Sequence, residues 1–109
     1  MNLIISFEVN GVHYWPNAPE EYKEFRMPHR HLFRFVVWVP VSGSRSSELF
    51  NVRKFLISTV LSLYPDYPSL NGGTDFGPSS CEEIATKLKA AVGASKVFVG
   101  EEYWLGAEV

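Results

Sequence analysis

Three histidines occupy positions from which their rings could share one cation. His29 and His31 are two residues apart at the start of an alternating apolar run, and His13 ends an earlier one. Side chains two apart on a strand point to the same face, so His29 and His31 should point the same way. If the two strands pair antiparallel, the end of the first lies beside the start of the second. We therefore expect the three imidazoles to meet.

Three imidazole nitrogens are a ligand set typical of catalytic zinc, because they leave a fourth position open for water or substrate. The same spacing has a simpler interpretation, since a histidine on a strand commonly serves as a hydrogen-bonded polar residue without a metal. On spacing alone, both interpretations stay open.

Alternation predicts the two strands that carry these histidines. Residues 2–13 place Leu3, Ile5, Phe7 and Val9 on one face, and residues 29–41 continue from the histidines with apolar residues at every odd position. The intervening residues 14–28 contain three prolines and predict a long excursion without regular structure. Loops of this length in a small domain commonly carry function.

Two helices are predicted in the second half of the chain. The first follows a cap at Ser46 or Ser47 and ends before Pro65, with an apolar stripe of Leu49, Val52, Phe55, Leu56, Val60 and Leu63. The second begins with a capping box, from Ser79 to Glu82 or from Ser80 to Glu83, and ends at Gly93. A loop over 66–78 separates them, and residues 95–101 and 103–109 predict two closing strands. This order of elements predicts one α+β domain over residues 1–109.

Composition limits the classes of partner. The 109 residues carry a net charge of −2, which gives no electrostatic reason to expect nucleic acid or an acidic membrane surface as a partner. No segment approaches the roughly 20 apolar residues of a membrane span, and the N-terminus lacks the features of a signal peptide. The single cysteine, Cys81, excludes an internal disulfide and fits a reducing compartment. We expect a cytoplasmic protein.

Four segments, taken in order, resemble the 6-pyruvoyltetrahydropterin synthase family, and most closely its queuosine-pathway branch, the 6-carboxytetrahydropterin synthases. They are "HYWPNAPEEYKE" followed by "HRH", "PDYPSLNG", "SSCEEIATKL" and "GEEYWLGAEV". The resemblance implies a tunnelling fold (T-fold): a four-stranded antiparallel sheet with two helices on one face, whose subunits assemble into a trimeric barrel, often stacked as a hexamer. It also implies that His13, His29 and His31 bind Zn²⁺.

The same resemblance assigns the substrate contacts. Glu101 matches the family's pterin anchor, and Ser80 matches a substrate-binding position at the start of the second helix. A carboxylate suits a pterin because it accepts hydrogen bonds from a ring N–H and the neighbouring amine together. The substrate implied is 7,8-dihydroneopterin triphosphate, a small molecule.

Two positions depart from the family pattern. Glu24 stands in the place of the catalytic cysteine, and Tyr67, next to Asp66, stands in the place of the catalytic histidine. Tyrosine titrates too high to shuttle protons at neutral pH as histidine does. Arg30 replaces a glycine between the two ligands, and its role is open. Cys81, in the first turn of a helix, is a weaker candidate for a displaced nucleophile.

These residues leave several functions open. The first is a zinc-dependent lyase in which Glu24, Asp66 and Tyr67 take the catalytic positions, and whose product is 6-carboxy- or 6-pyruvoyltetrahydropterin. A variant with Glu in place of Cys would make 6-hydroxymethyl-dihydropterin. The second is a homologue that binds metal and pterin but has lost turnover. The third is an oligomeric scaffold with remnant histidines.

Overall fold

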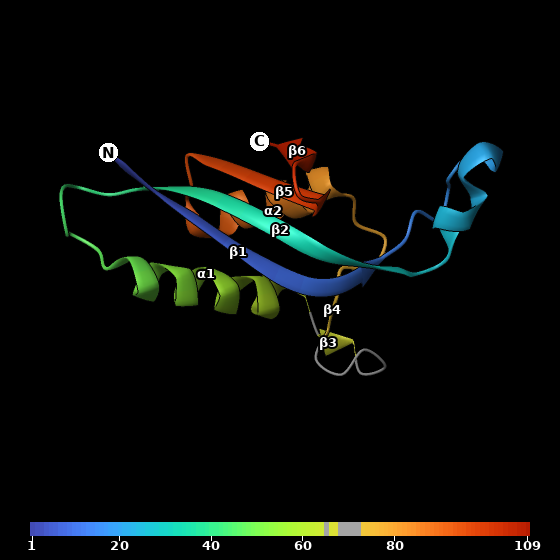
Figure 1. Ribbon diagram of the computed structural model, residues 1–109, viewed down its shortest axis with the longest axis horizontal. Helices are drawn as coiled ribbons and strands as arrows, with labels where there is room; N and C mark the ends of the chain where they lie inside the picture. The colour runs from blue at the N-terminus through green and yellow to red at the C-terminus, as the bar shows by residue number, and fades with distance from the viewer. Residues whose placement is uncertain (65, 68–72) are drawn as a thin grey trace.

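Two long strands form the centre of the sheet. β1 (Asn2–His13) and β2 (His29–Pro40) pair antiparallel over their whole length, from Asn2 opposite Pro40 to His13 opposite His29 (Figure 1). The structure is a computed structural model that describes residues 1–64, 66–67 and 73–109. The antiparallel pairing predicted for the histidine-bearing strands is confirmed.

The sheet is larger than the predicted four strands. Its order is β3-β4-β1-β2-β5-β6, with β5 (Lys96–Glu102) and β6 (Leu105–Glu108) antiparallel to their neighbours. β3 (Asp66–Tyr67) and β4 (Gly73–Asp75) lie where we predicted only a loop, and β4 runs parallel to the end of β1. Prediction of an all-antiparallel sheet was therefore wrong. Glycine and aspartate disfavour strands, so these short segments are recognised only by their pairing, β4 with β1 and β3 with β4.

Both helices cover one face of this α+β sheet, as predicted. α1 (Leu49–Leu63) and α2 (Cys81–Val92) contribute to the same core as the odd-numbered residues of β1, β2 and β5. Phe33, Phe35, Val37, Val97 and Val99 in that core are fully buried. The face that carries the histidines is thus the face that carries the hydrophobic core.

The N-terminal cap of α1 differs from the prediction. Glu48, and neither Ser46 nor Ser47, caps α1: its carboxylate accepts the N–H groups of Phe50 and Asn51 at 3.0 and 2.8 Å. Ser46 is instead engaged with Gly43 in the preceding turn. α1 buries only Leu56 and Val60 of its apolar stripe, and Leu49 and Phe55 are half exposed.

α2 has the predicted ends. Ser80 and Glu83 form the capping box, and Gly93 ends the helix in the left-handed conformation with φ of 66°. This fixes the first turn of α2, which carries Cys81, beside the end of the sheet that holds the histidines.

The excursion between β1 and β2 contains regular structure that we did not predict. Residues Glu20–Arg26 form a 3-10 helix, η1, interrupted at Tyr22, where φ is −123°. The whole excursion, residues 14–28, extends beyond one end of the sheet and is called the arm below; η1 is drawn light blue at the right of Figure 1. Within the arm, Arg26 donates a hydrogen bond from Nε to the Ala18 carbonyl oxygen at 2.8 Å.

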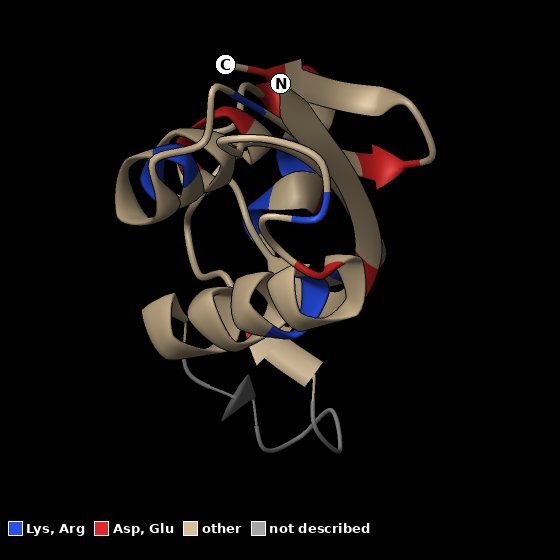
Figure 2. Ribbon diagram, turned by 90° about the vertical axis from the view of Figure 1, so that its left-hand side faces the viewer, with Lys and Arg blue, Asp and Glu red and all other residues tan. Residues whose placement is uncertain are grey.

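Basic and acidic residues are interspersed along the ribbon in Figure 2, in keeping with the small net charge. Among the described residues, none of the helices has the length and apolar character needed to cross a bilayer.

The close contact of Phe76 with β1 predicts a stability effect at Gly11, which lies opposite His31. A β-carbon at Gly11 would lie 2.6 Å from Phe76 Cε2 and 2.8 Å from the Thr74 carbonyl oxygen. We expect Gly11→Ala to lower the free energy of unfolding by about 1–3 kcal/mol through overpacking, measured by urea denaturation. Gly43→Ala is the control, because nothing lies within 4 Å of its β-carbon. Equal stability of the two variants would contradict the packing described.

Candidate metal centre

Four side chains from three strands converge at one end of the sheet. His13 ends β1, His29 and His31 begin β2, and Glu101 lies near the end of β5. Each offers one ligand atom, and these atoms all lie within 4.8 Å of one another. The histidine rings are close, with the His13 centroid 4.5 Å from that of His29 and 5.3 Å from that of His31. The predicted meeting of the three imidazoles is present in the structure.

Strand register explains why this group forms. His13 lies directly opposite His29, and His31, two residues further along, points to the same face. Glu101 follows Val97 and Val99 at the same two-residue spacing, so it continues their core-facing row. Phe33 lies beneath, edge to face with His13 and with His31. The polar group therefore closes the end of the hydrophobic core.

The Nδ1 atom of each histidine faces an acceptor. His13 Nδ1 lies 3.0 Å from the Ser79 carbonyl oxygen, and His29 Nδ1 lies 3.0 Å from the Met27 carbonyl oxygen. Because a carbonyl only accepts, each Nδ1 must carry the proton and donate. His31 Nδ1 lies 3.5 Å from a carboxylate oxygen of Glu102. In a neutral imidazole this leaves the lone pair on Nε2, an arrangement typical of metal-bound histidine.

The Nε2 atoms of two histidines face Glu101. Those of His13 and His31 are buried and have no hydrogen-bond partner among the described residues. His13 Nε2 lies 3.0 Å from Glu101 Oε1, and His31 Nε2 lies 3.6 Å from Glu101 Oε2. A lone pair on Nε2 and a carboxylate oxygen are both acceptors, so they repel unless a cation lies between them. The donor set therefore fits a metal ion on an observation independent of sequence.

The surroundings disfavour a charged His31 and favour an ionised Glu101. Burial is the main cause that lowers the pKa of His31, and the neighbouring His13 and His29 lower it further against the opposing effect of Glu101. The contact with His13 is the main cause that lowers the pKa of Glu101; burial opposes it, and the proximity of all three histidines acts in the same direction as the contact. Neutral imidazoles beside a carboxylate are the ligand forms that a divalent cation requires.

A cavity of about 590 Å³ adjoins the group. Its walls come from the end of β1, the arm, the first turn of α2 and the β5–β6 hairpin; among the lining residues are His13, His29, Glu101, Ser80, Trp15 and Phe25. The volume lies within the range of sites for small organic ligands. Glu101, which the family resemblance assigns to the substrate alone, thus borders both the histidines and the cavity.

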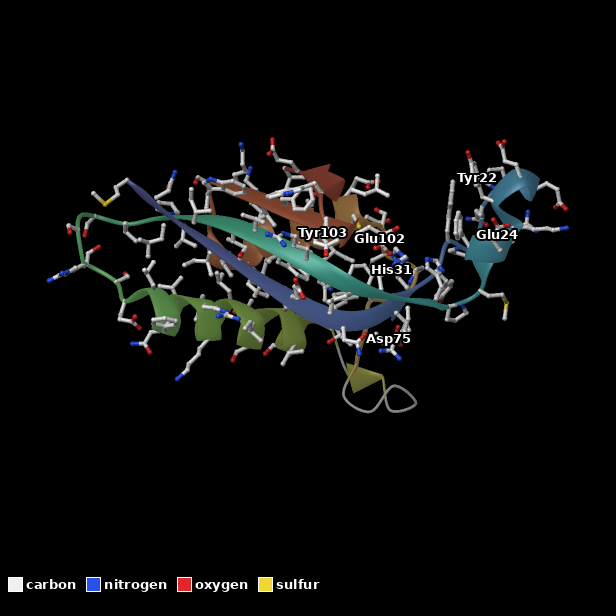
Figure 3. All side chains as sticks on the ribbon, viewed as in Figure 1. Tyr22, Glu24, His31, Asp75, Glu102 and Tyr103 are labelled. Carbon is white, nitrogen blue, oxygen red and sulfur yellow. The ribbon has the colours of Figure 1, made fainter. Side chains whose placement is uncertain are left out.

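The predicted catalytic residues are not brought to this cavity. Glu24 is exposed on η1 and is not among the described residues that line the cavity; Figure 3 shows it beside Tyr22 on the arm, apart from His31. The backbone of Asp66–Tyr67 forms β3, but the side chains of these residues lie outside what the structure describes, as do Leu70 and Asn71. Arg30 points away from the histidines and donates from Nη2 to Asn10 Oδ1 at 3.3 Å.

Sequence reasoning missed three contributors to the site. Trp15 and Phe25 line the cavity from the arm, and their rings belong to a series with Tyr22 and His29, at centroid distances of 6.3, 6.0 and 5.5 Å between successive rings. Glu102, to which the sequence analysis gives no role, contacts His31 (Figure 3). Trp15 and Phe25 could have been recognised from the sequence, because aromatic residues in a proline-rich loop of this length are candidates for a binding site.

Cys81 is buried, and burial is the main cause that raises its pKa to about 12, with Glu101 and Glu82 adding to it. At pH 8 only about one thiol in 10⁴ would then be ionised. We expect the folded protein to react with iodoacetamide far more slowly than the urea-unfolded protein, followed by mass spectrometry. Rapid alkylation of the folded chain at pH 8 would contradict this and restore Cys81 as a candidate nucleophile.

No family model matches the chain, and a search of curated proteins finds no significant match. The resemblance to pterin synthases therefore rests on the sequence segments quoted above.

Proposed function

We propose that the protein is a zinc-dependent lyase of the 6-pyruvoyltetrahydropterin synthase type, acting on 7,8-dihydroneopterin triphosphate. The observation that carries the proposal is the group of three histidines beside an open cavity, two of which, His13 and His31, have buried Nε2 atoms without a hydrogen-bond partner among the described residues. His13, His29 and His31 are the zinc ligands in this proposal. A bound Zn²⁺ would supply Lewis acidity, lowering the pKa of a substrate hydroxyl.

The cavity walls suit a flat heterocycle with adjacent donors. Trp15 and Phe25 offer ring faces for stacking, and both are partly exposed. Glu101 is ionised and can accept two neighbouring N–H groups of a pterin. Ser80 borders the same cavity, although its hydroxyl is engaged with Glu83 in the capping box and must be shared with any ligand.

The free edges of the sheet support the proposed T-fold trimer. β4 pairs with only Gly11 and Val12, which leaves most of the outer edge of β1 without a strand partner among the described residues. Ile4 and Leu32, on the face away from the helices, are more than half exposed. Joining such sheets into a barrel would pair the edges and cover this face. We expect light scattering after gel filtration to give the mass of three or six chains.

A second candidate is a metal- and pterin-binding protein without turnover. The described residues that line the cavity include Glu82, Glu83 and Glu101 but neither lysine nor arginine. An acidic wall disfavours a triphosphate, and Glu24 lies elsewhere. In this alternative, the unphosphorylated 7,8-dihydroneopterin would bind more tightly than the triphosphate.

Incubation of the zinc-loaded protein with each of the two pterins separates these functions. The lyase predicts consumption of the triphosphate, detected by chromatography, and loss of at least 100-fold in rate after zinc removal or in His29→Ala. Glu24→Gln is the matched variant on the arm: an unchanged rate would exclude Glu24 as the base. Binding of either pterin without product over many hours would reject the enzyme and favour the second candidate. Absence of both zinc and pterin binding would reject both and favour a scaffold.

A further inference from the structure

Glu101 has more contacts with the histidines than a residue that only anchors a pterin would need. Both of its carboxylate oxygens face imidazole nitrogens, Oε1 toward His13 and Oε2 toward His31. The family resemblance leaves the fourth position of the metal open, with Glu101 reserved for the substrate. The structure brings Glu101 into the ligand group itself.

Donor spacing tests whether this carboxylate could complete a metal site. For tetrahedral zinc with ligand bonds of about 2.0–2.1 Å, neighbouring donor atoms lie about 3.3–3.4 Å apart. Glu101 Oε1 lies 3.0 Å from His13 Nε2, and Glu101 Oε2 lies 3.6 Å from His31 Nε2, so each carboxylate oxygen is near that spacing from one histidine. Three nitrogens and one oxygen make a complete tetrahedral set for zinc.

A β-bulge explains how Glu102, as well as Glu101, reaches His31. The pairing of β5 with β6 shifts register between Gly100 and Glu102, so Glu101 is the extra residue of the bulge. Bulges redirect side chains and are common next to functional sites. As a consequence Glu101 and Glu102, although adjacent in sequence, both approach His31, one at Nε2 and the other at Nδ1. The two carboxylates therefore have different positions: Glu101 faces His31 Nε2 within the ligand group, whereas Glu102 faces Nδ1 of the same ring and orients it.

We infer that Glu101 is a fourth, exchangeable metal ligand: it closes the site when the cavity is empty, and a pterin must draw it away from the cation to bind. The exchange step rests on the proposed function, whereas ligation by Glu101 does not. The side chain is about one-third exposed toward the cavity, so it can rotate without unpacking the core. Binding of a pterin in the cavity would then displace Glu101 and open the fourth metal position at the same time.

The first test measures Zn²⁺ affinity by competition with a chelator, without any pterin. Glu101→Gln keeps the shape of the side chain but removes its charge, and we expect the affinity to fall by about 10- to 100-fold or more. Glu21→Gln is the matched control, since it removes the same charge from an exposed position on η1 that neither belongs to the ligand group nor lines the cavity; we expect a change below about threefold. Circular dichroism of the metal-free variants checks that both fold. An unchanged affinity in Glu101→Gln, or equal losses in the two variants, would overturn ligation by Glu101.

The second test follows the exchange in Co²⁺-substituted protein by visible absorption. Addition of neopterin should change the spectrum of the wild type, while Glu101→Gln should differ from the wild type before any pterin is added. Binding of neopterin, seen by quenching of tryptophan fluorescence, with an unchanged cobalt spectrum would reject the exchange but leave the proposed function intact. If neopterin does not bind at millimolar concentration, the exchange falls together with the proposed function, and the affinity test still decides ligation.

Discussion

The site depends on one unfavourable contact at the end of the sheet, in which two hydrogen-bond acceptors, His13 Nε2 and a Glu101 carboxylate oxygen, face each other. With its Nδ1 proton donated to the Ser79 carbonyl, His13 presents a lone pair to the ionised carboxylate of Glu101 at 3.0 Å. Burial prevents water from relieving this contact, and the second unpartnered Nε2, that of His31, repeats it. A proton on His13 would satisfy one contact only. A divalent cation would satisfy all four side chains together, which is why a metal is the simplest account of their arrangement.

The site is inseparable from the fold because both use the same face of the same strands. The row that buries Phe33, Phe35 and Val37 continues into His31 and His29, and the row through Val97 and Val99 continues into Glu101. A slip of one residue between β1 and β2 would move every core side chain to solvent and scatter the ligands at the same time. Metal binding should therefore stabilise the folded state, since an unfolded chain cannot present this ligand group.

Local pattern was enough to predict the parts of the site that depend on periodicity. Alternation placed His13, His29 and His31 on one face, and the capping box at Ser80 and the glycine at Gly93 bounded α2 correctly. Features that depend on contacts between distant segments were not predictable: β3 and β4, the cap at Glu48, the bulge at Glu101 and the ring series of the arm. Each of these is decided by a partner remote in sequence or by competition between neighbouring polar groups, which periodicity does not encode.

X-ray absorption spectroscopy at the zinc edge of the metal-loaded protein tests the central claim most directly. We predict a first shell of four nitrogen and oxygen neighbours at about 2.0–2.1 Å, with outer-shell scattering from three imidazole rings. A first shell containing sulfur at about 2.3 Å, or an oxygen-rich shell with one imidazole or none, would contradict convergence of His13, His29 and His31 on a single cation.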